Sequence, residues 1–264
     1  MSELDLEQTT IDCLKIVREV GSYIREQQEK VSQKDIITKD PNSFVTYVDK
    51  QSEIKLHRAL SALVPEATFI TEEATMENAD SDLVWIIDPL DGTTNFLYGI
   101  PMYSISVALK VRQKVAVGVV YAIQQDEIFY AWQGGGAYVN NRRISVAGQT
   151  ALQQALIGTG FPYNKATRME LPSRIFAKVL AKSRGVRRLG SAAMDLAYVA
   201  IGRLDGYYES HLNSYDIAAG GLIVQEAGGV VSDYGNTEQW INGESIIAAN
   251  PGLHRLLQSV IASV

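Results

Sequence analysis

The chain has 264 residues, of which 46% are hydrophobic and 20% charged, a balance typical of an ordinary globular protein. Its net charge of −6 argues against nucleic acid as a partner, because such binding depends on a basic surface. A single cysteine excludes an intramolecular disulfide. The N-terminus is acidic and unlike a signal peptide, and the sequence contains no apolar run of about 18 residues. These features and the low cysteine count predict a cytoplasmic protein without membrane contact.

The first half of the sequence predicts two helices followed by an antiparallel sheet. Apolar residues recur every three or four positions over residues 4–30, which is the helical period. The polar segment 31–44 predicts a loop, and Thr46 with Asp49 three residues later predicts the cap of a second helix. Between residues 68 and 133, short apolar runs separated by turns predict strands.

The second half alternates helices and strands more regularly. Helices are predicted over 168–184, 191–202, 216–228 and 252–264, with strands between them. No internal repeat and no long linker divides the chain. We therefore expect one α+β domain over 1–264, with an antiparallel sheet in a lobe of about 1–150 and a mixed sheet in a lobe of about 151–264.

Residues 85–96, WIIDPLDGTTNF, place two carboxylates just past an apolar strand. Asp88 and Asp91 are three residues apart, and residues 85–107 contain no Lys or Arg to neutralise them. Two like charges about 4 Å apart cost roughly 4 kcal/mol at an effective dielectric of about 20. Glu72 follows another predicted strand and Asp216 begins a helix, so the four acids could converge. An all-oxygen ligand set of this kind favours Mg²⁺ over Zn²⁺.

The residues after Asp91 suit a phosphate group. Gly92, Thr93 and Thr94 form a chain reversal with small side chains, which leaves backbone N–H groups able to face an anion. Magnesium ligands beside such N–H groups predict metal-dependent hydrolysis of a phosphate ester.

This string resembles the signature of the inositol monophosphatase family, within the fructose-1,6-bisphosphatase-like superfamily. The resemblance extends over nearly the whole chain through SFVTYVD (43–49), FITEEA (69–74), RLGSAAMDLAYVAIGRLDGYYE (188–209), YDIAAGGLIVQEAGG (215–229) and IIAAN (246–250). It implies a layered α/β/α/β/α sandwich of the inositol monophosphatase and sugar phosphatase type, lithium sensitivity and a homodimer.

The resemblance also implies a role for each matching residue. It makes Glu72, Asp88, Asp91, Asp216 and the backbone carbonyl of Leu90 ligands of two to three Mg²⁺ ions, with Glu72 at the ion that carries the attacking water. Thr93, hydrogen-bonded to Asp49, would orient or deprotonate that water. The residues implied to bind substrate are Asp91, Gly92, Thr93, Gly190, Ser191, Ala192, Glu209 and Asp216. Lys39 would approach a third, weaker Mg²⁺ region.

Two departures from the family pattern concern the substrate more than the chemistry. Thr71 stands where the family usually has Gly, and Tyr215 stands where it usually has Trp. The expected substrate is myo-inositol 1-phosphate or a similar small polyol or sugar phosphate. Fructose 1,6-bisphosphate, NADP, histidinol phosphate and a 3′-phosphonucleotide remain alternatives.

Two other classes of function remain open. A phosphatase with an aspartyl-phosphate intermediate, of the haloacid-dehalogenase-like type, would need one residue between its acids, whereas two separate Asp88 from Asp91. A regulatory or binding protein on an inactive phosphatase scaffold is the other alternative. The basic segment 178–188 is interpreted as a solvated helix face that leads into the substrate wall rather than as an RNA-binding patch.

Overall fold

The computed structural model describes residues 4–31, 37–40, 43–73, 81–162, 168–242 and 244–264, with the backbone alone for 37–40 and 43–45. Helices are distributed along the whole of this described chain. They are α1 (Leu6–Gln27), α2 (Tyr47–Leu63), α3 (Thr93–Leu97), α5 (Glu170–Lys182), α6 (Ala192–Ala200), α7 (Ser214–Glu226), α8 (Pro251–Ala262) and the 3-10 turns η2 (Leu152–Gln154) and η3 (Gln239–Asn242).

The first large sheet comes from the first half of the chain and is almost entirely antiparallel. Its seven strands lie in chain order, and only β3 and β4 are parallel to each other. The strands are β3 (Thr68–Thr71), β4 (Leu83–Asp91), β5 (Ser104–Val111), β6 (Lys114–Ala122), β7 (Glu127–Trp132), β8 (Gly136–Val139) and β9 (Arg142–Arg143).

The second large sheet comes from the second half and is mixed. Its order is β11-β10-β12-β14-β13, with β10 parallel to both β11 and β12 and the remaining pairs antiparallel. The strands are β10 (Leu156–Thr159), β11 (Gly185–Arg187), β12 (Gly206–Ser210), β13 (Val230–Ser232) and β14 (Ser245–Ala249).

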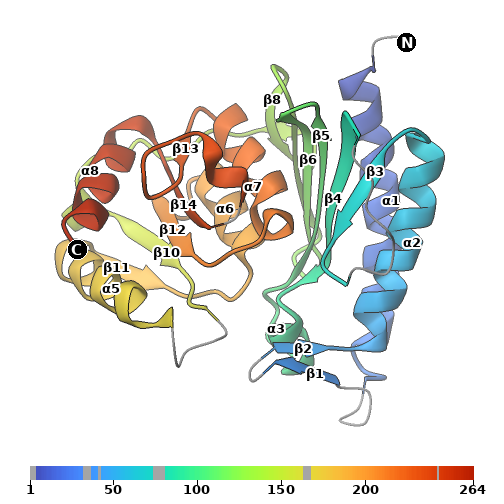
Figure 1. The fold of residues 1–264 in the computed structure, drawn as a ribbon, viewed down its shortest axis with the longest axis horizontal. Helices are drawn as coiled ribbons and strands as arrows, with labels where there is room; N and C mark the ends of the chain where they lie inside the picture. Colours follow the sequence, from blue (N-terminus) through green and yellow to red (C-terminus); the bar gives the residue numbers. More distant parts are fainter. Residues whose placement is uncertain (1–3, 32–36, 41–42, 74–80, 163–167, 243) are drawn as a thin grey trace.

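These elements stack in five layers, α1/α2, sheet, α6/α7, sheet and α5/α8, as Figure 1 shows. Alternation along the strands explains the stacking, because successive side chains point to opposite faces of a sheet. In β4, Trp85 and Ile87 pack in the cluster with α1 and α2, whereas Val84 and Ile86 pack in the cluster with α6 and α7. The predicted layered α+β fold is confirmed.

The segment 31–44 departs from its prediction. Within it and just beyond, β1 (Ile37–Asp40) and β2 (Ser43–Val45) form an antiparallel pair, where a loop was expected. A two-stranded ribbon is held by backbone hydrogen bonds, which polar residues also make, so its sequence need not show apolar alternation. The side chain of Lys39 lies outside the described residues.

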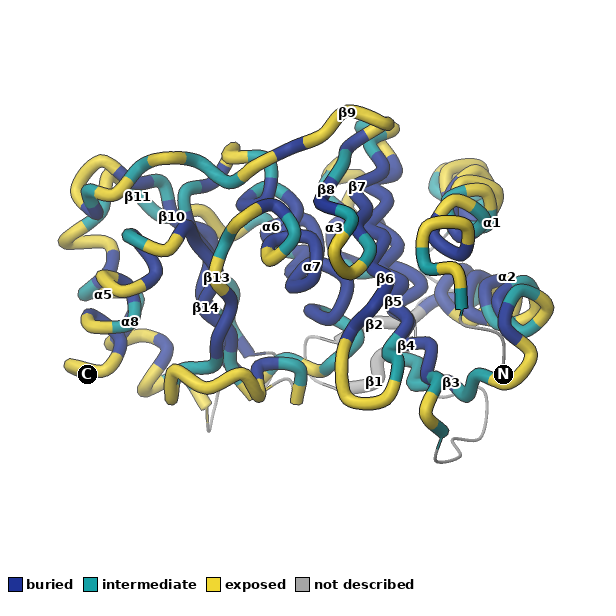
Figure 2. The backbone as a smooth tube through the Cα atoms, turned by 90° about the horizontal axis from the view of Figure 1, so that it is seen from above, coloured by how far each residue is buried: buried dark blue, intermediate teal, exposed yellow. Residues whose placement is uncertain are grey.

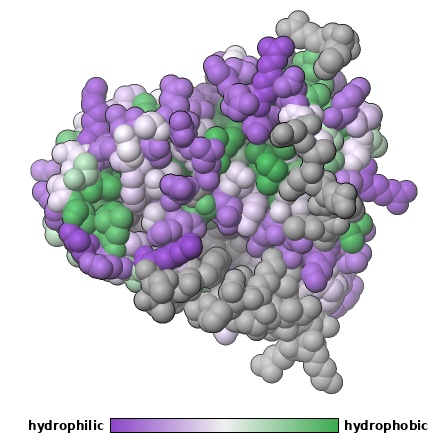
Figure 3. All heavy atoms as spheres, viewed as in Figure 1, coloured by the Kyte–Doolittle hydropathy of each residue, from purple (hydrophilic) through white to green (hydrophobic). Residues whose placement is uncertain are grey.

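The buried parts of the chain concentrate in the middle layers. In Figure 2, α6, α7 and the central strands of both sheets are mostly buried, while the outer faces of α1, α5 and α8 are exposed. Hydrophilic side chains cover much of the face in Figure 3, with smaller groups of hydrophobic ones. Among the helices of the described chain, none is both long and apolar enough to cross a membrane.

Candidate functional site

A β-bulge in β4 turns Asp88 and Asp91 to the same side of the large sheet. In a regular strand, residues three apart point to opposite faces. Here Asp88 pairs with Ser106 of β5 and Asp91 with Ser104, so three steps along β4 match two along β5. The extra residue restores the parity, and both carboxylates lie on the face toward α6 and α7. Pro89 fits within the bulge because a missing N–H costs little where ladder pairing is interrupted.

The parallel pairing of β3 with β4 brings a third carboxylate beside them. Thr71 lies opposite Ile87, so the next residues along the two strands, Glu72 and Asp88, are neighbours. The Glu72 N–H donates to the Ile87 carbonyl at 3.2 Å, which continues the ladder by one residue. Glu72 lines the same cavity as Asp88.

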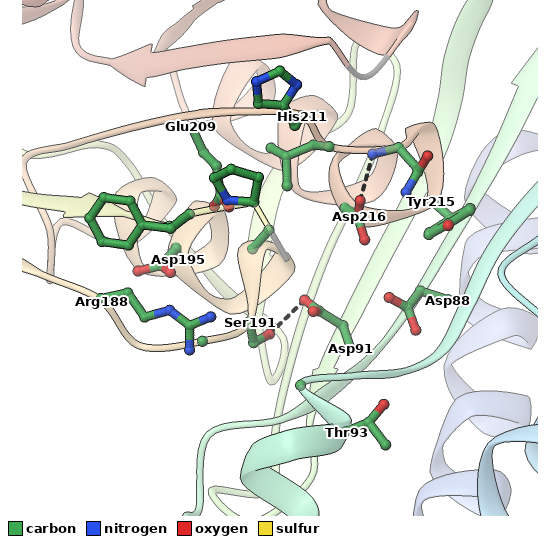
Figure 4. A pocket seen from close by; sticks show the side chains of 18 of the residues that line it. Asp88, Asp91, Thr93, Arg188, Ser191, Asp195, Glu209, His211, Tyr215 and Asp216 are labelled. Carbon is green, nitrogen blue, oxygen red and sulfur yellow. Dashed lines mark hydrogen bonds between the residues drawn. The ribbon is translucent and has the colours of Figure 1, made fainter. Parts of the chain in front are cut away.

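Asp216 reaches this place from the other direction, in the first turn of α7. Its Oδ2 accepts from the Asn213 N–H at 2.6 Å, and a carboxylate is favoured at a helix N-terminus. The Ser106 hydroxyl of β5 donates to the Tyr215 carbonyl at 3.1 Å and ties α7 to the sheet. Among the described residues, Asp88, Asp91 and Asp216 form a group in which one carboxylate oxygen from each residue lies within 4.8 Å of the other two (Figure 4). Glu72 is not in that group.

The negative charges in this group repel one another. Burial, and then the negative charges of Glu72, Asp91 and Asp216, hold the pKa of Asp88 well above its usual range. Burial and the Asp91 charge likewise raise the pKa of Asp216, and burial raises the pKa of Asp91 to about 6. The Arg188 charge favours ionised Asp91 but does not offset its burial, so the group as a whole suits a bound divalent cation. The donors are all carboxylate oxygens, which fits Mg²⁺.

Asp91 is held in place by α6. Its Oδ2 accepts from the Ser191 hydroxyl at 2.6 Å and from the Ala193 N–H at 2.8 Å. Ser191 is the N-cap of α6 and also accepts from the Met194 N–H at 3.2 Å. Gly190, Ser191 and Ala192, expected from the sequence to contact substrate, all line the cavity, and the Ser191 hydroxyl is engaged with Asp91.

Thr93 connects the cavity to a buried carboxylate behind it. Its hydroxyl lies 2.9 Å from Asp49 Oδ1 and 3.1 Å from the Leu90 carbonyl. Asp49 is fully buried, accepts from the Thr46 N–H and hydroxyl through its other oxygen, and is not among the residues that line the cavity. Among the described residues, Thr93 is the cavity-lining residue that is hydrogen-bonded to Asp49. Leu90 lines the cavity although its side chain packs in the α1/α2 cluster, so its backbone is the part that faces the site.

Gly92 permits the turn between the bulge and α3. It has φ +97°, and a Cβ there would lie 2.9 Å from the Met102 carbonyl. A side chain is therefore excluded both by the left-handed backbone and by close approach.

The cavity extends from the acidic group toward β12, with a volume of about 370 Å³. Glu209, expected from the sequence to bind substrate hydroxyls, lines this far end. The cavity lining also includes Asp195, Arg188 and Arg168, which the sequence did not identify as site residues. Asp195 is the one acid in the otherwise apolar helix α6, and this isolated charge is the sequence feature that could have marked it as a site residue. Arg188 was assigned to a solvated basic stretch.

Acidic groups at the far end also have raised pKa values. Burial raises the pKa of Glu209 to about 7, opposed by a hydrogen bond from Tyr207 and by the Arg188 charge. Burial and the Glu209 charge hold the pKa of Asp195 well above its usual range. Figure 4 shows Asp195 and Arg188 grouped on the side of the cavity away from Asp88.

Comparisons with known proteins identify the family of this chain. The inositol monophosphatase family model matches residues 5–264. The chain is 40% identical over 233 residues to the inositol-1-monophosphatase of Mesorhizobium japonicum, covering 88% of each chain. It is 37% identical over 252 residues to the Nus factor SuhB of Pasteurella multocida, covering 95% of this chain and 93% of that one.

A solved relative shows the same fold. The inositol monophosphatase from Anabaena (Nostoc) sp. PCC 7120 superimposes with a TM-score of 0.87 at 31% identity, covering 98% of this chain and 97% of that one. The chain belongs to the inositol monophosphatase family.

Proposed function

We propose that this protein is a Mg²⁺-dependent phosphomonoesterase that hydrolyses myo-inositol 1-phosphate or a similar small polyol or sugar phosphate. The observation that carries the proposal is the group of Asp88, Asp91 and Asp216, in which one carboxylate oxygen from each lies within 4.8 Å of the other two. Asp91 of this group directly precedes Gly92 and Thr93. The family is metal-dependent, and the donor set is the kind that Mg²⁺ prefers.

Each acidic residue has a part in this proposal. Asp88, Asp91, Asp216, Glu72 and the Leu90 carbonyl would hold two to three Mg²⁺ ions. Magnesium bound there would supply Lewis-acid stabilisation of the phosphate and a lower pKa for an attacking water. The Ser191 hydroxyl and the Ala193 N–H fix the rotamer of Asp91, so its other oxygen has a defined direction.

Thr93 would handle the proton of the attacking water. With its own hydrogen directed to Asp49, the Thr93 hydroxyl has a lone pair available to accept from water, and Asp49 keeps it in that orientation. The Gly92 and Thr93 N–H groups, at the turn into α3, would receive phosphate oxygens.

The experiment is phosphate release by purified protein with and without Mg²⁺. The panel contains inositol 1-phosphate, fructose 1,6-bisphosphate, NADP, histidinol phosphate and a 3′-phosphonucleotide. We expect Mg²⁺-dependent release with inositol 1-phosphate as the best substrate. Release only from another member of the panel would keep the chemistry and change the substrate, and absence of release from all five would contradict the proposal. Acid-quenched reactions should contain no phospho-aspartate, whose presence would instead support a haloacid-dehalogenase-like reaction.

Three further properties belong to the same proposal and are separately testable. Lithium should inhibit phosphate release at millimolar concentration by occupying a magnesium position beside Asp88, Asp91 and Asp216. The protein should sediment as a homodimer, and cell fractionation should place it in the cytoplasm.

A second candidate function is a Nus factor role. Relatives named Nus factor SuhB match along almost the whole chain, at 37% identity in Pasteurella multocida and 40% in Haemophilus influenzae. Such a role would involve contact with RNA polymerase and is a form of the regulatory alternative that the sequence left open. Co-purification of RNA polymerase with both the wild type and a catalytically inactive Asp91→Asn variant would support it, and recovery equal to an untagged control would oppose it.

A further inference from the structure

The far wall of the cavity contains a hydrogen bond that the proposed function does not use. Tyr207 and Glu209 lie two residues apart on β12 and therefore on the same face of the strand. The Tyr207 hydroxyl donates to Glu209 Oε2. Tyr207 is fully buried in the cluster between the two large sheets, which leaves its ring no room to turn away.

The neighbouring strand makes room for the Glu209 carboxylate. Gly160 directly follows β10, which pairs in parallel with β12. A Cβ at position 160 would overlap both carboxylate oxygens of Glu209. Glu209 is thus held from one side by Tyr207 and occupies a space that exists only because residue 160 has no side chain.

The charges around Glu209 come from several elements. Arg188, just before α6, favours the ionised form of Glu209, whereas the Asp91 charge opposes it. Glu209 in turn acts on the pKa values of groups on α6, α7, β12 and the segment after β13, namely Asp195, Asp216, Tyr207, Tyr208 and Tyr234. An ionised Glu209 therefore depends on local hydrogen bonds and on Arg188.

We propose that Tyr207 is a positioning residue that fixes the Glu209 carboxylate, committing Oε2 to Tyr207 so that Oε1 accepts a hydrogen bond from a hydroxyl group on the alcohol part of the substrate. This inference rests on the proposed function, which assigns Glu209 to substrate binding. The corresponding substrate class is a phosphate monoester whose alcohol carries at least one further free hydroxyl.

The chemistry of a carboxylate explains this preference. An ionised carboxylate only accepts hydrogen bonds, so it matches a hydroxyl donor and repels a second phosphate at the same place. When Tyr207 occupies one oxygen, the other keeps one direction rather than exchanging positions, which lowers the ordering cost of binding.

The test compares Tyr207→Phe with the wild type on two esters. Inositol 1-phosphate carries free hydroxyls, and p-nitrophenyl phosphate carries none. We expect the KM for inositol 1-phosphate to rise about tenfold, as for the loss of one hydrogen bond to a charged group, with kcat changed less than about twofold. The KM for p-nitrophenyl phosphate should stay within about twofold. Equal KM changes for both esters, or a fall in kcat alone, would overturn the inference.

Tyr208→Phe is the matched control. Tyr208 is the next residue of β12, but its side chain packs on the opposite face of the small sheet, in the cluster with α5 and α8. Removing its hydroxyl should leave both KM values unchanged. A KM increase for inositol 1-phosphate equal to that of Tyr207→Phe would indicate a general effect on the strand and would contradict the proposal.

A double-mutant cycle links the effect to Glu209. In a Glu209→Gln background, Tyr207→Phe should raise KM by less than about twofold, because the carboxylate to be positioned is gone. Gly160→Ala offers an independent route and should reproduce the KM increase by displacing the same carboxylate. If the effects of Tyr207→Phe and Glu209→Gln on KM were fully additive, the inference would be contradicted.

Binding measured without turnover separates this inference from the proposed function. Calorimetric titration with inositol 1-phosphate and Mg²⁺, carried out in a Thr93→Ala background so that little ester is consumed, should give about tenfold weaker binding when Tyr207→Phe is added. If the wild type binds but releases no phosphate, the proposed reaction fails while a weaker Tyr207→Phe complex still supports the positioning role. Equal affinities would overturn that role.

Discussion

The two ends of the cavity are both acidic, but the charges and hydrogen bonds around their carboxylates differ. At the β4 bulge, Asp88 faces three other acids whose charges raise its pKa. At the far end, Glu209 has a hydrogen bond from Tyr207 and the Arg188 charge in its favour. At the first end, the Arg188 charge and two hydrogen bonds favour ionised Asp91, but no cationic side chain among the described residues is found to do so for Asp88 and Asp216. These two acids therefore need a cation from solution to balance their charge, whereas Glu209 obtains part of its compensation from the protein.

This difference indicates which end of the cavity binds metal and which end binds the alcohol part of the substrate. Asp88 and Asp216, which lack a compensating protein charge, are suited to bind metal, and Glu209, which has one, is suited to accept a hydrogen bond from a neutral hydroxyl. Metal removal and substitutions near the bulge should therefore affect turnover, while substitutions near β12 should affect substrate affinity.

The largest effect is expected for Asp91→Asn. The substitution preserves shape but removes a charged ligand, and loss of several kcal/mol of metal-dependent stabilisation corresponds to about a thousandfold or more in kcat/KM. Steady-state phosphate release is the measurement. Near wild-type turnover in this variant would contradict the assignment of the acidic group to metal binding.

Thr93→Ala should lower kcat by about a hundredfold or more with little change in KM, the usual range for removing a proton-handling group. Thr94→Ala is the control, since it alters the next residue of α3, which does not line the cavity. A large KM increase with unchanged kcat would make Thr93 a binding residue instead.

Glu209→Gln should raise KM for inositol 1-phosphate by about tenfold and also change its pH dependence. The wild-type pKa of Glu209 is raised to about 7, so the carboxylate gains a proton below that pH and becomes a poorer acceptor. The wild-type KM should therefore rise as pH falls below about 7, and the KM of the variant should not. Parallel profiles for the two proteins would assign the titration to another group.

The smallest effect concerns the metal-free protein. Folding raises the pKa of Asp91 from 3.8 to about 6, so this group contributes stability below about pH 4 that is lost as pH rises through about 6. Without metal, the Tm of the wild type should fall by a few degrees over this range relative to that of Asp91→Asn. Mg²⁺ should restore the wild-type Tm at pH 7.5, and identical curves for both proteins would refute the cost of burying the Asp91 charge.

The sequence revealed the bulge end of the cavity because its residues are contiguous. Asp88, Asp91, Gly92 and Thr93 follow one another along a single strand and turn, and the repulsion between the two acids can be recognised without a structure. The layered fold was also predictable, because apolar alternation in strands and helical spacing elsewhere specify which faces are buried.

The far end was harder to predict because its residues are not adjacent in the sequence. Gly160, Arg188, Asp195 and Tyr207 come together only through the pairing of β10 with β12 and the packing of α6 on them. Tyr207 looks like an ordinary core aromatic in the sequence, and the engagement of Ser191 with Asp91 depends on where α6 begins. The division into two lobes and the roles of the individual site residues remain predictions.

The most direct test of the account is a calorimetric titration of metal-free protein with Mg²⁺ in the presence of inorganic phosphate. We compare the wild type with Asp91→Asn and, as a control at the other end of the cavity, with Glu209→Gln. The account predicts saturable Mg²⁺ binding by the wild type and Glu209→Gln, and strongly weakened binding by Asp91→Asn. Isotherms that are the same for wild type and Asp91→Asn would show that the acidic group at the β4 bulge is not the magnesium site.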